Sequence, residues 1–190
     1  MINGLTDALF ALLLVGVIAV YLSSMAGRLD RIHHRIETAA AALDAQLLRR
    51  SLLASDLAES GLLDPASSLL LLDAARQAIA VESVDTAARS AAESNLTAVL
   101  AEVFARPPDG NDVLPDNTGS LDAEDLELLS ELASCCRRVE LARRFHNDAV
   151  GSARELRRRR LVRWFRLAGR TALPHTVEMA DTPPPGLART

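Results

Sequence analysis

Residues 8–26 read Ala8-Leu-Phe-Ala-Leu-Leu-Leu-Val-Gly-Val-Ile-Ala-Val-Tyr-Leu-Ser-Ser-Met-Ala26 and contain no charged side chain. Asp7 and Arg28 lie on either side of them. At about 1.5 Å per residue, a helix of this length spans roughly 28 Å, which is close to the hydrocarbon thickness of a bilayer. A helix is needed because lipid offers no partner to unpaired backbone N–H and C=O groups. The stretch therefore predicts a transmembrane helix within an N-terminal anchor, residues 1–27.

A cleaved signal peptide is the alternative interpretation, because Ser24-Met25-Ala26 before Gly27 resembles a small-x-small cleavage site. Two features favour a retained anchor. No basic residue precedes residue 8, and the apolar run is longer than the roughly 7–15 residues usual in signal peptides. We therefore expect the lipid bilayer to be a partner of this protein through residues 8–26.

The charges beside the apolar stretch predict its orientation. Arginines follow it at positions 28, 31, 35, 49 and 50, and no basic residue precedes it. Basic residues are enriched on the cytoplasmic side of membrane proteins. The pattern predicts a single-pass protein of the cell membrane, with its N-terminus outside and its C-terminal body in the cytoplasm.

The composition favours helices for this body. Aromatic residues make up only 3% of the chain, so the core must be built mainly from Ala and Leu, which favour helices over strands. All 21 basic residues are Arg, a bias typical of a GC-rich bacterial genome. The two cysteines are neighbours, Cys135 and Cys136, and lack the spacing of a metal site or of a secreted disulfide framework. We expect both to fill the core as reduced thiols.

Apolar residues recur at steps of three and four, which predicts three long helices after the anchor. These are residues 28–60, continuous with the membrane helix, residues 66–105, and residues 121–169. Gly61 and Pro65 separate the first two, and Asp64 or a nearby Ser is expected to cap the second. Residues 107–120 are rich in Pro and Gly and are expected to form a loop.

This pattern predicts an all-α fold in which the N-terminal transmembrane helix continues into an elongated antiparallel bundle of long helices with coiled-coil packing. The bundle would occupy residues 28–169. Residues 170–190 contain Pro183-Pro184-Pro185-Gly186 and are expected to form a disordered tail. Arg50 falls near a core position, so we expect it to pair with a carboxylate on a neighbouring helix.

Residues 142–150, Ala-Arg-Arg-Phe-His-Asn-Asp-Ala-Val, resemble the A-R-x-F-Y-N-x-x-V signature of the LemA family of bacterial membrane-anchored helical proteins. Residues 43–50 resemble the stretch ahead of that family's R-R-x-x-L-I-P-N-L motif, and residues 92–97 resemble its A-E-x-x-L segment. The resemblance covers residues 5–168. Ser55-Asp56 stands where the family has Pro-Asn, so the chain looks like a divergent branch. The resemblance implies a single-pass anchor, an elongated helical bundle and no settled enzymatic activity.

The signature residues Arg143, Phe145, His146 and Asn147 are candidate functional side chains. His146 and Asp148 could bind a metal or transfer protons, but residues two apart on a helix point in different directions. The favoured interpretation is that Arg143 and Asn147, which are one turn apart, make interhelical hydrogen bonds that fix the register of the bundle.

The strongest charge pattern lies in residues 154–170, where eight arginines accompany one carboxylate. Leu161, Trp164, Phe165 and Ala168 share a helical face, so the segment predicts a basic amphipathic helix that suits a membrane surface or a partner. The alternative has equal weight: the apolar face merely continues the core of the bundle, and the arginines are solvated. The candidate interaction residues are Arg154, Arg157, Arg158, Arg159, Arg160, Arg163, Trp164, Arg166 and Arg170.

The position of this segment depends on the number of helices before it. Three alternating helices would put it at the end of the bundle far from the membrane, roughly 50 Å away. Lipid charge acts only over about 8–10 Å. A protein partner or a polyanion is therefore favoured over the anchor's own membrane.

The chain contains no Walker loop, G-x-S-x-G, H-E-x-x-H or G-x-G-x-x-G motif. We therefore expect a non-enzymatic scaffold or adaptor in the plasma membrane that presents a helical bundle to cytoplasmic partners. No cofactor, metal ion or small-molecule substrate is inferred, and nucleic acid is disfavoured as a partner. Another protein or a second copy of the chain is expected instead. The alternative is a binder of polyanions or anionic lipids that acts through residues 154–170.

Overall fold

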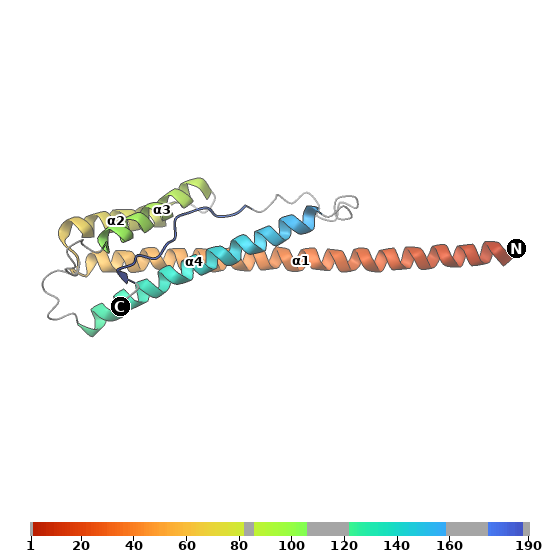
Figure 1. Ribbon diagram of the computed structural model, residues 1–190, viewed down its shortest axis with the longest axis horizontal. Coiled ribbons are helices and arrows are strands. Elements are labelled where there is room, and N and C mark those ends of the chain that lie inside the picture. Colours follow the sequence, from red (N-terminus) through yellow and green to blue (C-terminus); the bar gives the residue numbers. More distant parts are fainter. Residues whose placement is uncertain (1, 82–85, 106–121, 159–174, 188–190) are drawn as a thin grey trace. The chain divides into compact units, whose positions relative to one another are not determined.

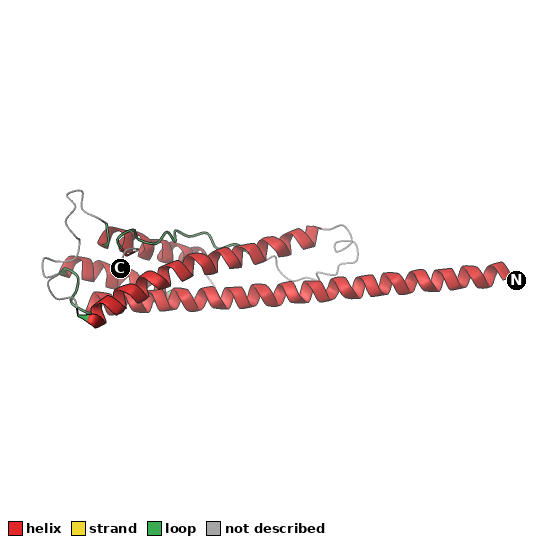
Figure 2. Ribbon diagram, turned by 60° about the horizontal axis from the view of Figure 1, so that its bottom comes forward, coloured by secondary structure: helices red, strands yellow, loops and turns green. Residues whose placement is uncertain are grey.

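The computed structural model describes residues 2–81, 86–105, 122–158 and 175–187. This part of the chain contains helices and no strand (Figure 1, Figure 2), which confirms the all-α fold. The helices are α1 (Ile2–Glu59), α2 (Pro65–Ala80), α3 (Thr86–Val103) and α4 (Ala123–Arg158). The chain divides into two compact units. Unit 1 comprises Met1–Thr38 and Asp148–Thr176, and unit 2 comprises Ala39–Asn147 and Val177–Thr190.

Helix α1 contributes to both units, because it runs without a break from Ile2 to Glu59. In unit 1 its apolar side chains from Leu9 to Tyr21 are exposed. Within the described residues, α1 is the one helix that is long and apolar enough to cross a membrane. The expected helix over residues 8–26 is therefore confirmed, and its location in a bilayer stays a prediction based on length and composition.

The connection from α1 to α2 follows the signals in the sequence. Gly61 has a φ of 81°, in the left-handed region that glycine adopts readily. The Asp64 carboxylate accepts hydrogen bonds from the backbone N–H groups of Ala66 (3.0 Å) and Ser67 (3.1 Å), and Pro65 begins the helix. Hydrogen bonding by Ser67 is the main reason why the pKa of Asp64 is lowered. The expected cap of α2 is confirmed.

Replacing Asp64 with Ala is expected to lower the unfolding temperature of the full chain by a few degrees at pH 7, because two N–H groups lose their acceptor. The folded-state pKa of Asp64 is lowered, so its contribution to stability is present above the unfolded-state pKa and is lost as the pH falls through the folded-state pKa. The two unfolding temperatures should therefore converge in acid. Thermal unfolding followed by circular dichroism at several pH values measures this. Asp64→Asn keeps an acceptor oxygen and is the control; an equal loss for Asn would contradict the cap.

The prediction of one helix over residues 66–105 is wrong. Helix α2 ends at Ala80, the φ and ψ of the next residue, Val81, are extended at −74° and 122°, and α3 begins at Thr86. The two helices pack against each other. Neither Gly nor Pro marks this break, and the signal in the sequence is Val81-Glu-Ser-Val-Asp85, in which β-branched and short polar residues are weak helix formers. The described residues therefore form four helices where three were expected.

The core of unit 2 draws aliphatic side chains from all four helices. The largest fully buried members are Leu57, Leu71, Leu96, Leu100, Leu129 and Leu132. Burying each such side chain contributes on the order of 1.5–3 kcal/mol. The aliphatic faces of the helices therefore share a core in unit 2, as their periodicity predicts.

Polar contacts between the helices of unit 2 give their directions. As the residue number rises along α1, the number of its partner rises along α3 and falls along α4. The pairs are Asp44–Arg89 and Arg50–Glu93 with α3, and Gln46–Arg138 and Arg49–Glu131 with α4. Helix α3 therefore runs parallel to α1 in unit 2, and α4 runs antiparallel to it.

The predicted disorder of the tail is wrong for residues 177–187. This segment forms neither an α-helix nor a strand (Figure 2). Pro184 and Leu187 are nevertheless buried, and Leu187 joins the helical core. Val177 and Met179 pack against a second group of buried side chains that includes Val139. Prolines prevent a helix here, but an extended segment can still bury every third or fourth side chain. Residues 170–174 and 188–190, and the predicted loop 107–120, lie outside the described residues.

Candidate functional site

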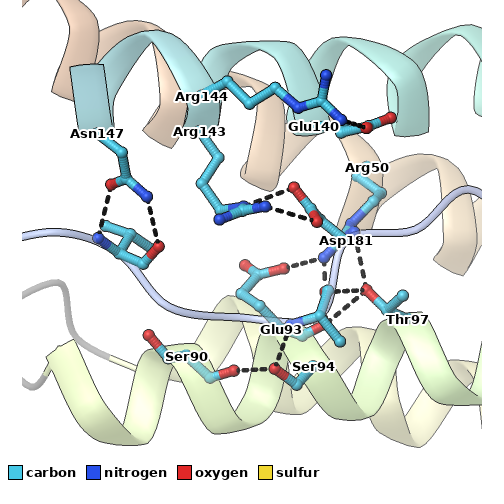
Figure 3. A network of polar contacts seen from close by, with 12 residues as sticks. Arg50, Ser90, Glu93, Ser94, Thr97, Glu140, Arg143, Arg144, Asn147 and Asp181 are labelled. Carbon is cyan, nitrogen blue, oxygen red and sulfur yellow. Dashed lines mark hydrogen bonds and ion pairs between the residues drawn. The ribbon is translucent and has the colours of Figure 1, made fainter. Parts of the chain in front are cut away.

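A buried ion pair lies inside unit 2 (Figure 3). Arg50 and Glu93 are 1% and 2% exposed, and Arg50 Nη2 donates to Glu93 Oε2 at 2.6 Å. The guanidinium also donates to the Glu93 backbone oxygen (3.2 Å) and to Thr97 Oγ1 (3.1 Å). The expected carboxylate partner of Arg50 is therefore confirmed. Arg50 Nε has no hydrogen-bond partner within the described part of the chain.

The tail passes between α3 and α4 next to this pair, and α4 holds it by two side chains (Figure 3). Asn147 Nδ2 donates to the backbone oxygen of Val177 (3.1 Å), and Asn147 Oδ1 accepts from the backbone N–H of Val177 (2.9 Å). Arg143 donates to both oxygens of Asp181, from Nε at 2.6 Å and from Nη2 at 3.0 Å. Such bidentate, charge-assisted pairs are the stronger class of hydrogen bond.

Helix α3 holds the tail from the other side. The backbone N–H of Ala180 donates to Ser94 Oγ (3.0 Å), and the backbone oxygen of Ala180 lies 2.9 Å from Thr97 Oγ1. The Thr97 hydroxyl proton has a second acceptor, the Glu93 backbone oxygen at 3.0 Å. Because Thr97 also accepts from Arg50, it connects the buried ion pair to the tail.

The end of the described tail contacts the end of α3. A Cβ atom at Gly186 would lie far inside contact distance of the Phe104 carbonyl oxygen, so this approach requires glycine. The backbone N–H of Leu187 donates to the Pro184 oxygen at 3.1 Å, which closes a turn. We name the side chains and backbone that receive the tail the tail-binding surface: Ser94, Thr97, Phe104, Arg143 and Asn147.

The prediction that Arg143 and Asn147 bond between helices is wrong about their partners, because both bond to the tail. Hydrogen bonding to Asp181 raises the pKa of Arg143. Of the other signature residues, His146 is buried and Phe145 is exposed. Nothing in the sequence marks Asp181 as the partner of Arg143, because the composition of the tail is typical of a disordered segment.

The two cysteines lie in the core of unit 2, as expected. Cys135 Sγ lies 3.5 Å from the Gln46 backbone oxygen, to which it donates. Burial raises the pKa of both Cys135 and Cys136. Both groups are therefore thiols rather than thiolates near neutral pH.

A thiol reagent at pH 8 is expected to react with the folded chain at least about tenfold more slowly than with the chain in denaturant, because only an accessible thiolate reacts. The unfolded thiols ionise first as the pH rises, so their contribution to stability is present below the unfolded-state pKa and is lost as the pH rises through the folded-state pKa. Absorbance of the released thiol probe gives the rates. The control places one cysteine on the same helix by Arg137→Cys, with both native cysteines replaced by Ala; equal rates in the two proteins would contradict the burial.

The basic segment is described only as far as Arg158, so Arg159, Arg160, Arg163, Trp164, Arg166 and Arg170 lie outside the described residues. Arg157 Nη2 is 3.1 Å from His33 Nε2, and both residues belong to unit 1. His33 follows the apolar stretch by seven residues, or about 10 Å of helix. The start of the segment therefore contacts α1 about 10 Å after the apolar stretch, and not roughly 50 Å from it as three alternating helices predict. The difference arises because the residues expected to form one second helix form α2 and α3, so that α4 runs antiparallel to α1.

An open surface pocket of about 530 Å³ lies between α1 and α4 in unit 2. Its charged side chains have both signs, and two of them, Arg49 and Glu131, bond to each other, while Arg138 donates to the amide oxygen of Gln46. Hydrogen bonding to Glu131 raises the pKa of Arg49. The opposite charges leave no field of one sign to attract an ion.

In the described residues, no group of three or more His, Cys, Asp or Glu side chains could hold a metal ion. Comparison with models of protein families, with curated proteins and with solved structures gives no match. The resemblance to the LemA family therefore stays a prediction from residues 142–150 and the segments before them.

Proposed function

We propose that this protein is a membrane-anchored helical scaffold that holds unit 2 at the bilayer surface for binding to other proteins. The continuity of α1 carries the proposal. One helix supplies the exposed apolar side chains from Leu9 to Tyr21 and also Leu43, Leu47 and Arg50 in the interior of unit 2. A body that shares its core helix with its anchor stays at the membrane unless it is cleaved or unfolded. The proposed type is non-enzymatic and similar to the LemA family.

We place the N-terminus outside the cell and unit 2 in the cytoplasm, because arginines follow the apolar stretch and none precedes it. Cysteine labelling in intact cells tests this orientation. Asn3→Cys and Thr190→Cys are made separately in a chain whose native cysteines are replaced by Ala. A membrane-impermeant reagent should label only position 3. Labelling only at position 190 would reverse the orientation.

The anchor is tested in the full chain by adding charge to α1. Leu14→Arg with Val15→Arg is expected to move the protein out of the membrane fraction, because each arginine at the centre of a spanning helix costs about 2.5–3.5 kcal/mol. The matched control is Leu48→Arg with Leu52→Arg, at two exposed positions of the same helix in unit 2. Carbonate extraction measures the membrane-bound fraction, and equal fractions for the two variants would overturn the anchor. Loss of an N-terminal tag from the mature protein would show cleavage instead.

A scaffold needs only to hold its body at the membrane and needs no catalysed reaction. A chain in which residues 8–26 are replaced by another apolar helix of equal length should keep the protein contacts of the native chain in cells. Photocrosslinking from exposed Leu69 of α2 records those contacts. Turnover of a substrate by the purified full chain, lost on changing one polar residue, would contradict a non-enzymatic scaffold.

A second candidate function, binding of anionic lipid headgroups, is favoured by the contact between Arg157 and His33. If α1 spans the bilayer, this contact lies about 10 Å beyond the apolar stretch, within the range of about 8–10 Å over which lipid charge acts. The unit 1 residues near this level contain more arginines than carboxylates: Arg28, Arg31, Arg35, Arg154, Arg157 and Arg158 against Asp30, Glu37 and Glu155.

Lipid retention separates this candidate from the scaffold. The full chain is placed in nanodiscs of mixed phosphatidylserine and phosphatidylcholine, extracted, and examined by native mass spectrometry for bound lipid. Replacing Arg154, Arg157 and Arg158 with Gln should reduce the retained phosphatidylserine. The control replaces Arg76, Arg137 and Arg144, three exposed arginines of unit 2, and should not. Equal retention in the two variants would reject the lipid site.

A further inference from the structure

We infer that the tail-binding surface recognises an extended peptide chain, and that a second copy of this protein can supply that peptide in place of the chain's own residues 177–187. The surface and the tail both belong to unit 2. The inference therefore goes beyond the scaffold proposal and holds whether or not α1 spans a membrane.

The contacts divide between the backbone and the side chains of the tail, as they do where an extended peptide is added to the edge of a sheet. Four backbone groups of the tail, the N–H and C=O of Val177 and of Ala180, meet side chains of the surface. Backbone contacts of this kind give affinity for any extended chain, and side-chain contacts give specificity. Here the specific contacts are the carboxylate of Asp181 on Arg143 and the buried side chains of Pro184 and Leu187.

The polar side chains of the surface keep partners when the tail is absent. The Thr97 hydroxyl can donate to the Glu93 oxygen at 3.0 Å, and Ser94 Oγ already donates to the Ser90 oxygen at 2.7 Å. Arg143 and Asn147 are only partly buried, so water can replace the tail. No buried donor would be left unsatisfied by its departure, which lowers the barrier to exchange. Within the described residues, the Arg50–Glu93 pair makes no direct hydrogen bond to the tail and is connected to it only through Thr97.

The proposed occupant of the tail-binding surface is the tail of a second copy of this protein. Its tail has the same sequence and so matches every contact of the surface. Residues 159–174 connect α4 to the tail, and their covalent length allows at most roughly 55 Å between its ends. That length would allow the tail to reach a neighbouring copy, and mutual exchange between two copies would give a closed, symmetric pair.

Charge reversal on opposite sides of the contact tests the exchange with full-length chains. Arg143→Glu disables the surface of one copy, and Asp181→Arg disables the tail of another. The two variants carry different tags and are expressed together. If the tail crosses between copies, the Asp181 tail of the first meets the Arg143 surface of the second, and the two reversed residues also attract. The two variants expressed together should therefore form a heterodimer, whereas neither variant expressed alone should form a dimer. Tag capture and mass photometry in detergent measure both outcomes.

Combining both reversals in one chain, and replacing Arg143→Glu by Arg144→Glu, are the controls. The combined chain should regain the unfolding temperature of the native chain. Arg144 is exposed and pairs with Glu140 of its own helix, so its reversal should not create a heterodimer. Restored stability in the combined chain without any heterodimer in the mixture would confine the tail to its own copy and overturn the exchange.

A labelled synthetic peptide of residues 175–190 gives a second readout, should either reversed chain fold poorly. Its affinity for the full Asp181→Arg chain is expected to be at least about tenfold higher than for the Arg143→Glu chain, because only the first keeps the bidentate arginine. Fluorescence anisotropy measures both affinities, and circular dichroism checks that the chains are folded. Equal affinities, or no saturable binding to a folded Asp181→Arg chain, would overturn peptide recognition by this surface.

Discussion

Replacing Glu93 with Ala is expected to lower the free energy of unfolding of the full chain by about 3–5 kcal/mol, because Arg50 would remain charged inside unit 2 without its partner. Arg50 is 1% exposed, so water cannot take the place of the lost carboxylate unless the helices separate. Urea unfolding in detergent, followed by circular dichroism, measures the change. The slope of the transition with urea should stay the same if the native state is otherwise intact.

Two further variants test whether the loss of stability is specific to the buried Arg50–Glu93 pair. Glu131→Ala removes the partner of Arg49, the neighbouring arginine on α1, in a pair that is partly exposed, and its effect should be much smaller. Changing Arg50 and Glu93 together to Leu should recover most of the stability, because apolar side chains of similar volume often replace a buried pair without loss. A loss for Glu93→Ala no larger than that for Glu131→Ala would show that the buried pair does not stabilise the protein.

Replacing Gly186 with Ala is expected to lower the free energy of unfolding by about 1–3 kcal/mol, the usual range when extra atoms are forced into packed structure. The new methyl group would meet backbone atoms of Phe104, which cannot rotate away as a flexible side chain would. The tail would have to move, and Pro184 and Leu187 would lose their burial. Chemical unfolding measures the loss, and faster proteolysis after residue 174 should report the displaced tail.

Gly151→Ala is the matched control for this substitution. A Cβ at Gly151 meets nothing within 4 Å, and the residue lies in the interior of α4. Alanine is the better helix former by about 0.5–1 kcal/mol, so this variant should be more stable than the native chain. If both alanine variants change stability alike, the contact with Phe104 does not fix the tail.

Structure that depends on neighbouring residues could be predicted from the sequence. The uncharged run before Arg28, the 3–4 spacing of aliphatic residues and the Asp64-Pro65 start of α2 each lie within one continuous stretch of chain. Arg50 could be paired in advance, because an arginine at a core position needs a carboxylate wherever that carboxylate lies in the sequence. The identity of Glu93 required the structure.

Sequence reasoning failed where the result depends on distant contacts or on weak local preferences. The break after Val81 has no Gly or Pro, and missing it reversed the direction expected for α4 and misplaced the basic segment. The tail resembles a disordered segment in composition, and its order comes from contacts with residues 30 to 86 positions away. The sequence pattern marks Arg143 and Asn147 as hydrogen-bonding residues, but their partners lie in the tail, whose composition is typical of disorder.

Through the two hydrogen bonds between Asn147 and Val177, helix α4 offers the tail the same pair of groups as the edge strand of a β-sheet. The side-chain amide offers one donor and one acceptor, as a peptide group of a neighbouring strand would. These two hydrogen bonds therefore depend on the backbone of residue 177 and not on its side chain. Over evolution, that contact alone would exclude only proline at this position, which has no N–H to give, whereas the packing of Val177 against Val139 and its neighbours favours an apolar side chain.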